Sequence, residues 1–183
     1  IIPLGEAETV AFVSYPALYP LNDYIFSESL VVSAGKTATL SDGAKYRSVK
    51  IEGSGKLRIN SGEMWVGDLQ IESGAKIEFV SPGSQTILHV NGSFIWRGTI
   101  QNSDSFNESI ARGFKLIQHS ANRMYVDDRF MGAIFAPYSH VVLGQSHKLF
   151  YGSVVANSIS VHQYATIRFV KFNPTVLYYS IAF

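Results

Sequence analysis

Five histidines are the first residues in this 183-residue chain whose chemistry suggests a functional site. Imidazole rings bind transition metals and exchange protons near neutral pH. No two of these histidines have the close spacing on one element that zinc sites use, and the chain has no cysteine. We therefore expect no built metal site and no cofactor. His140 and His162 fall on outward positions of the repeat described below, which makes them candidates for a weak contact with a sugar or a transition metal.

Carboxylates could act as a paired acid and base, as in enzymes that cut polysaccharides, or bind calcium. The 14 acidic residues are scattered, and only Glu52 and Glu72 fall in one outward column of the repeat. The segment GSGK at 53–56 is similar to part of a phosphate-binding loop, but it lacks the upstream glycine and the following serine or threonine. Because no catalytic set is complete, we predict that the chain is not an enzyme.

Aromatic side chains are the remaining candidates for binding, because a flat ring can stack on the C–H face of a sugar. Tyr46 and Trp65 occupy similar places in successive repeats, which predicts a short aromatic strip along one edge. Tyr138, Tyr151 and Tyr164 add aromatic surface elsewhere. The alternative is that these rings only seal the corners of the fold.

The overall composition restricts the class of partner. Fifteen lysines and arginines balance 14 acidic residues, so the chain lacks the positive charge typical of binding to nucleic acids or anionic membranes. Hydrophobic residues make up 46% of the chain, enough for a folded core, and no apolar run is long enough to cross a bilayer. The chain starts at Ile1 rather than at a methionine, and we expect a processed or excised piece of a larger polypeptide.

A repeat of about 20 residues must position these candidates. The stretches SLVVSAGKTATL, SVKIEGSGKLRI and DLQIESGAKIEF start at Ser29, Ser48 and Asp68, and LHVNGSFIWRG from Leu88 continues the series. Apolar and polar residues alternate in each stretch, as in a β-strand, and glycine-containing corners separate the strands. The alignment predicts four stacked apolar columns: Leu30, Val49, Leu69 and Leu88; Val32, Ile51, Ile71 and Val90; Ala38, Leu57, Ile77 and Trp96; and Leu40, Ile59, Phe79 and Gly98.

This repeat predicts an all-β fold, a right-handed parallel β-helix with coils of about 20 residues. We expect a single domain over 1–183 whose solenoid covers 29–169. The repeat returns near the end of the chain, where Gly132 aligns with Gly152 and Val141 with Val161. The last repeat puts four residues on the four columns, in order: Ile159, Val161, Ile167 and Phe169. The polar segment 101–113 breaks the pattern and predicts a loop or short helix. Residues 1–28 and 170–183 are expected to cap or flank the stack, because uncovered end coils expose strand edges.

The segment GAIFAPYSHVVLGQSHKLFYGSVVANSISVH, which starts at Gly132, resembles the closing part of a β-helical domain of bacterial secreted and cell-surface proteins. In that group a G-x-I-x-A-P-x-x-x-V coil is followed by a Y/F-G-x-x-x-A-x-x-I-x-V coil. The resemblance covers roughly 29–169 and implies a right-handed β-helical module of adhesins, pilus-associated proteins or polysaccharide-handling proteins. No catalytic motif comes with it. A more distant likeness is to the polymer-forming bactofilins.

These observations favour a non-catalytic extracellular module for adhesion or carbohydrate binding, secreted or held at the cell surface within a larger bacterial protein. The expected partners are a polysaccharide or cell-surface glycan and other domains of the same polypeptide, not nucleic acid and not a membrane. Two alternatives stay open. A polysaccharide-degrading β-helix enzyme predicts a groove with two or more carboxylates, and a structural self-assembling solenoid predicts uncovered ends.

Overall fold

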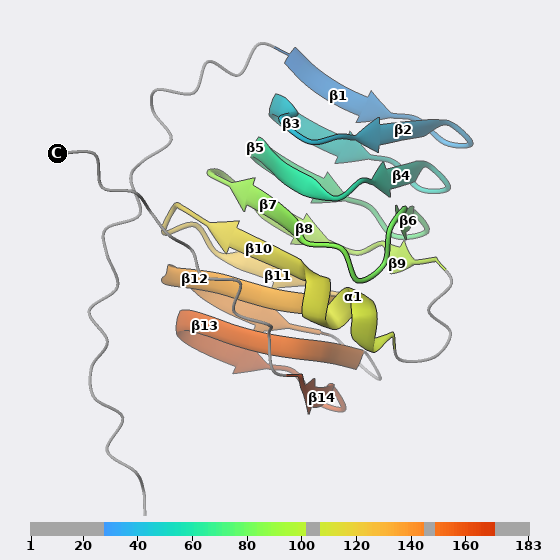
Figure 1. The fold of residues 1–183 in the computed structure, drawn as a ribbon. Helices are drawn as coiled ribbons and strands as arrows, with labels where there is room; N and C mark the ends of the chain where they lie inside the picture. The colour runs from blue at the N-terminus through green and yellow to red at the C-terminus, as the bar shows by residue number, and fades with distance from the viewer. Residues whose placement is uncertain (1–27, 102–106, 145–148, 171–183) are drawn as a thin grey trace, which may run out of the picture.

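Short parallel strands wind around one axis in the computed structural model of the protein, which describes residues 28–101, 107–144 and 149–170 (Figure 1). The strands form a ten-stranded sheet, the long sheet, and a four-stranded sheet, the short sheet. Each coil returns by a crossover to pair in parallel with the coil before it, and such crossovers are right-handed. The molecule is a right-handed parallel β-helix of about seven coils, which confirms the predicted fold class.

The long sheet runs the full height of the described stack. Its strands are β1 (Glu28–Val32), β3 (Lys45–Ile51), β5 (Gly62–Ile71), β7 (Thr86–Val90), β8 (Phe94–Trp96), β10 (Phe114–Gln118), β11 (Met124–Val126), β12 (Phe130–Leu143), β13 (Leu149–Val161) and β14 (Thr166–Phe169). The short sheet lies beside the first coils, with strands β2 (Thr37–Leu40), β4 (Lys56–Ile59), β6 (Lys76–Phe79) and β9 (Thr99–Ile100).

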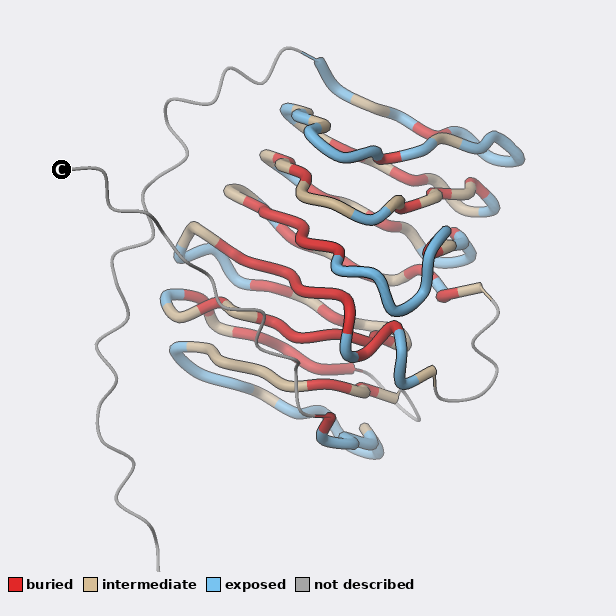
Figure 2. Tube along the Cα trace, in the orientation of Figure 1, coloured by how far each residue is buried: buried red, intermediate tan, exposed pale blue. Residues whose placement is uncertain are grey.

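Stacked apolar side chains form one core along the axis. Alternate residues of each strand point inward, and neighbouring strands lie about 4.8 Å apart, so like residues stack from coil to coil. The first three coils pair as the repeat predicted, with Leu30, Val49 and Leu69 in one column. Figure 2 shows that buried residues are concentrated in the middle of the stack.

The predicted alignment of the fourth coil is wrong. Phe94 and Trp96, rather than Leu88 and Val90, continue the columns of Leu69 and Ile71. The reason is the length of β5, whose first half pairs with β7 while its second half pairs with β8. Trp96 does point inward, as predicted, and it is fully buried, but Ile100 rather than Trp96 pairs with Ile77.

The later repeat is confirmed over its first part only. Gly132 pairs with Gly152 as predicted, but Val141 pairs with Ile159 instead of Val161. The register between β12 and β13 shifts between Ala136 and His140, which moves every later pair. Such irregularities re-aim the side chains that follow them.

The predicted break at 101–113 contains a short helix, α1 (Glu108–Gly113), whose first turn is capped by the side chain of Asn107. Its residues Ile110 and Ala111 are buried against the core. The predicted caps at 1–28 and 170–183 lie almost entirely outside the described residues. Within the described part of the chain, no helix is long and apolar enough to cross a membrane.

Candidate functional site

A hydrogen-bonded row of three side chains crosses the outer face of the long sheet; we call it the Glu63–His89–His119 row. The Nε2 atom of His89 lies 2.6 Å from Oε1 of Glu63, and its Nδ1 atom lies 2.8 Å from Nε2 of His119. These residues come from β5, from β7 and from the position after β10. The row therefore joins three coils that are adjacent in space.

Strand pairing explains why these residues meet. Trp65 pairs with His89, and His89 pairs with Ile117 on β10. Glu63 lies two positions before Trp65 and His119 two positions after Ile117, so strand alternation puts all of them on the same face of the sheet. Diagonal neighbours on one face are within reach of long side chains.

A stack of rings supports the row. The Trp65 and His89 rings are nearly parallel, with centroids 5.3 Å apart, and the His89 and His119 centroids lie 5.0 Å apart. On the opposite side of Trp65, the Lys45 ammonium lies 5.4 Å from the indole centroid. Because Lys45 and His89 come from strands on either side of β5, they cover opposite faces of the indole.

The hydrogen bonds fix where the protons lie. An ionised Glu63 can only accept, so the Nε2 atom of His89 donates to it. The Nδ1 atom of a neutral His89 is then an acceptor, and Nε2 of His119 donates to it. This leaves a lone pair on Nδ1 of His119, a buried atom for which the described residues provide no hydrogen-bond partner.

Burial keeps both imidazoles neutral. It lowers the pKa of His89, and the nearby Lys115 charge adds to this effect while Glu63 opposes it. Burial, with a smaller contribution from the repulsion that a protonated His89 would exert, lowers the pKa of His119 to about 4. Burial also lowers the pKa of Lys115. The row can therefore relay a proton between Nδ1 of His119 and Glu63, but the neutral state is favoured at pH 7.

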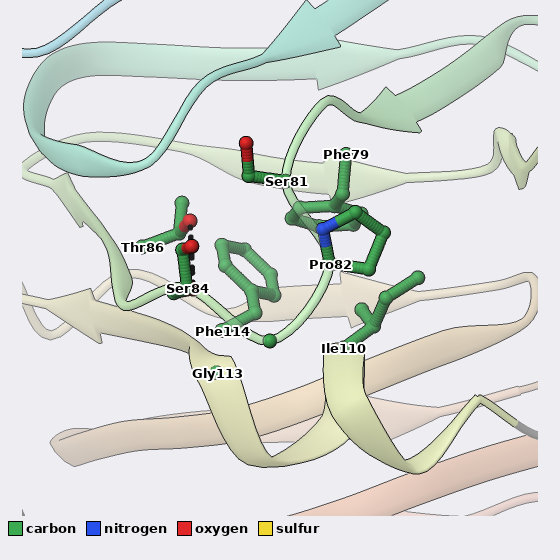
Figure 3. Close-up of a pocket in the computed structure, with 9 residues that line it drawn as sticks. Phe79, Ser81, Pro82, Ser84, Thr86, Ile110, Gly113 and Phe114 are labelled. Carbon is green, nitrogen blue, oxygen red and sulfur yellow. Dashed lines mark hydrogen bonds between the residues drawn. The ribbon is translucent and has the colours of Figure 1, made fainter.

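Two features limit the chemistry of this row. Three of its four ring nitrogens are used in hydrogen bonds within the row, and the described residues contain no group of three side chains placed to hold a metal ion. A hollow beside α1 is lined by residues that include Phe79, Pro82, Ser84 and Phe114 (Figure 3). Its empty volume of about 150 Å³ is smaller than the several hundred Å³ of a typical ligand pocket.

The predicted aromatic strip does not form. Tyr46 pairs with Val66 and packs against the core, whereas Trp65 pairs with Lys45 and points outward. Adjacent strand residues point to opposite faces, so a difference of one position in the alignment separates the two rings. Both faces of the Trp65 indole are already covered by Lys45 and His89, which leaves no open platform for a sugar.

The other predicted site residues are dispersed. His140 lies beside the Ser158 and Ser160 hydroxyls, at 2.6 Å from Nδ1 and 3.0 Å from Nε2. His162 is exposed at the end of β13, and no hydrogen bond joins it to His140 among the described contacts. Tyr138, on β12, is 42% exposed. His147 lies outside the described residues.

Sequence alignment missed the Glu63–His89–His119 row because it compared His89 with Lys50 and Gln70. In the structure Ile95, not His89, pairs with Gln70. The sequence signal that could have predicted the row is the similarity of β7 to the first half of β5. There Met64 pairs with Leu88 and Val66 with Val90, which places His89 beside Trp65.

A second surface feature lies in the last coil. Four residues that continue the inward columns are exposed there: Ile159, Val161, Ile167 and Phe169, at 46, 50, 49 and 74%. The adjacent Tyr164 is 71% exposed. We call these five residues the end surface. It is the largest group of exposed large apolar side chains on one coil of the described chain.

Comparison with known proteins was informative only at the level of families. No curated protein and no solved structure matches the chain. A family described as "Domain of unknown function (DUF7305)" matches residues 21–172, which include the whole described solenoid. The chain belongs to the DUF7305 family.

Proposed function

We propose that this domain is a non-catalytic adhesion module of a larger bacterial secreted or cell-surface protein, and that it binds an apolar protein surface through its end surface. The observation that carries the proposal is the exposure of Ile159, Val161, Ile167 and Phe169, residues of the type that is buried elsewhere in the stack. Exposed contiguous apolar surface of this kind is typical of interaction sites. The rigid coils behind it would present it without loss of conformational freedom.

The Glu63–His89–His119 row supports a non-catalytic role. Its donors and acceptors pair mainly with one another, its central ring is 5% exposed, and its aromatic neighbour is covered on both faces. A hydrogen-bonded row with a buried central ring stabilises the packing of three coils. We infer that its main role is structural.

The test is retention on octyl-coated beads at nanomolar concentrations of the domain. Val161→Glu should reduce retention at least about tenfold, since a charge at the centre of an apolar contact is costly to desolvate. Val31→Glu is the matched control, because Val31 is 57% exposed on the first coil, far from the end surface. Equal retention of the wild type and Val161→Glu would rule out the end surface as the binding site.

Carbohydrate binding is the second candidate, and the exposure of Tyr138 and Tyr164 favours it. Both tyrosines can present a ring edge or face to a sugar. A glycan array, or a pull-down with insoluble polysaccharide, should show binding that Tyr138→Ala or Tyr164→Ala reduces. Binding that survives both substitutions together would place any glycan site elsewhere.

A further inference from the structure

The end surface exists because the last coil has no further coil stacked on it within the described chain. Ile159 and Val161 continue the columns of Val141 and Leu143, which are 0% and 2% exposed. The same residue types change from fully buried to half exposed in a single step along the axis. A second layer of apolar side chains would restore the burial found one coil earlier.

The opposite end of the stack is different. On the first coil, two inward-column residues, Val32 and Leu40, are 2% and 0% exposed, and the other two, Leu30 and Ala38, are partly buried. The described solenoid therefore exposes its inward residues much more at the last coil than at the first. A head-to-tail filament would place that open coil against a coil whose core residues are already buried.

The strand edge at this end is also available for pairing. Among the described strands, β14 pairs with β13 only over Leu149–Gly152, so Ser158–Val161 has a strand partner on one edge alone, β12. Natural edge strands are usually protected by charges or proline. Residues 158–169 contain no proline and a single charged residue, Arg168. The edge thus lacks the usual protection against pairing with another chain.

We propose that the occupant of the end surface is a second copy of this chain, joined by a two-fold axis so that the two last coils face each other. This inference rests on the proposed function and names its partner. A two-fold axis normal to the long sheet makes the two copies of β13 antiparallel, a pairing that sheets readily form. It also covers Ile159, Val161, Ile167 and Phe169 of each copy with the same residues of the other. The contact is closed, so assembly stops at two copies.

Sedimentation equilibrium over nanomolar to hundred-micromolar concentrations tests the stoichiometry. The wild-type chain should pass from one to two copies of its 20.2 kDa mass and go no further. Val161→Glu should raise the dimer Kd by at least about a hundredfold, since two buried carboxylates would face each other. Val31→Glu, with the same substitution at the other end, should leave the Kd unchanged. Circular dichroism and the Tm of each variant exclude loss of folding as the cause.

Spin labels test the orientation, because the chain has no cysteine and each introduced thiol is unique. Lys36 and Gln163 are exposed in the turns of the first and last coils. In the two-fold dimer, labels at Lys36→Cys should lie roughly 70 Å apart, twice the height of a seven-coil stack. Labels at Gln163→Cys should lie less than about half that distance apart. Equal distances for both pairs would show head-to-tail stacking and overturn the proposal.

A wild-type chain that stays monomeric at every concentration would also overturn the proposal. If it nevertheless kept retention on octyl beads that depends on Val161, the adhesion module would stand and its partner would be another protein. A chain lacking 171–183 that dimerises when the full chain does not would show that the chain's own segment occupies the surface. Loss of octyl retention alone would instead remove the proposed function.

Discussion

His89 illustrates how an outward position can become part of the protein's interior. It lies on the outer face of the long sheet, yet it is only 5% exposed, with Trp65 stacked on its ring. A buried imidazolium would be costly, so the ring stays neutral and uses both nitrogens in hydrogen bonds to Glu63 and His119. The tautomer of His89 thereby depends on residues from two other coils.

Stability should fall as the pH is lowered from about 6.5 to about 4. The pKa of His119 is lowered from 6.5 to about 4 in the folded state. Between these values the unfolded chain binds the proton and the folded chain does not, so acid favours unfolding. The contribution is fully present above 6.5 and lost once the pH approaches 4. Urea unfolding at stepped pH should show this loss.

The variant His119→Phe keeps a ring in the stack but removes the titration. Its free energy of unfolding should depend less steeply on pH between 6.5 and 4 than that of the wild type. The slope is the informative quantity, since the variant also leaves Nδ1 of His89 without its donor and so loses stability at every pH. Identical slopes for the two proteins would show that His119 is not neutral in the folded state.

The pairing of β12 with β13 depends on two glycines in register. A Cβ atom added to Gly152 would lie 1.7 Å from the carbonyl oxygen of Gly132, and its φ of +155° is one that other residues rarely adopt. We expect Gly152→Ala to lower the free energy of unfolding by about 3 kcal/mol, because the backbones of the two strands would have to separate. Urea unfolding measures the change.

Gly35→Ala is the matched control for this close approach. Gly35 has a φ of +71°, and an added Cβ would meet nothing within 4 Å. Only the conformational cost remains, about 1 kcal/mol. A loss at Gly152 no larger than the loss at Gly35 would mean that β12 and β13 separate easily, contrary to the structure.

The elements that could be predicted from sequence are those in which each strand of a coil pairs with a single strand of the next coil. The coils from Ser29 to Phe79 keep a step of 19 or 20 residues, so the alternation of apolar residues located their columns directly. The fourth coil failed because β5 pairs with β7 along its first half and with β8 along its second. The period of the sequence does not show that one strand pairs with two others. For the same reason the sequence did not predict the Glu63–His89–His119 row.

The same reasoning explains why the end surface was not predicted. The repeat correctly put Ile159 and Val161 in the columns of Leu69 and Ile71. It was wrong to align Ile167 and Phe169 with the short sheet, because they pair with Phe150 and Gly152 in the long sheet. Exposure depends on whether another coil follows, which periodicity does not report. The expectation of capped ends concerned segments outside the described residues. In the part that the structure describes, the inward residues of the last coil are exposed and those of the first coil are largely buried.

The whole solenoid is stabilised by contacts between neighbouring coils, so its stability need not be uniform along the axis. β5 lies between β3 on one side and β7 with β8 on the other, and its inward residues are fully buried. β14 has one neighbouring strand, and all four of its residues are exposed. Local opening is therefore easier at the last coil than in the middle of the stack.

Amide hydrogen exchange should follow this gradient at nanomolar concentrations, where the proposed dimer should dissociate. Peptides that cover β14 should exchange fastest, and peptides from β5, β7 and β10 should be the most protected, because opening them breaks contacts with two coils. At concentrations that favour two copies, protection should rise for 158–169 and stay unchanged for β5. The Val161→Glu chain should show the gradient without this rise. Uniform exchange along the wild-type chain would instead mean that the coils open as one cooperative unit, and that the exposed end confers no local weakness.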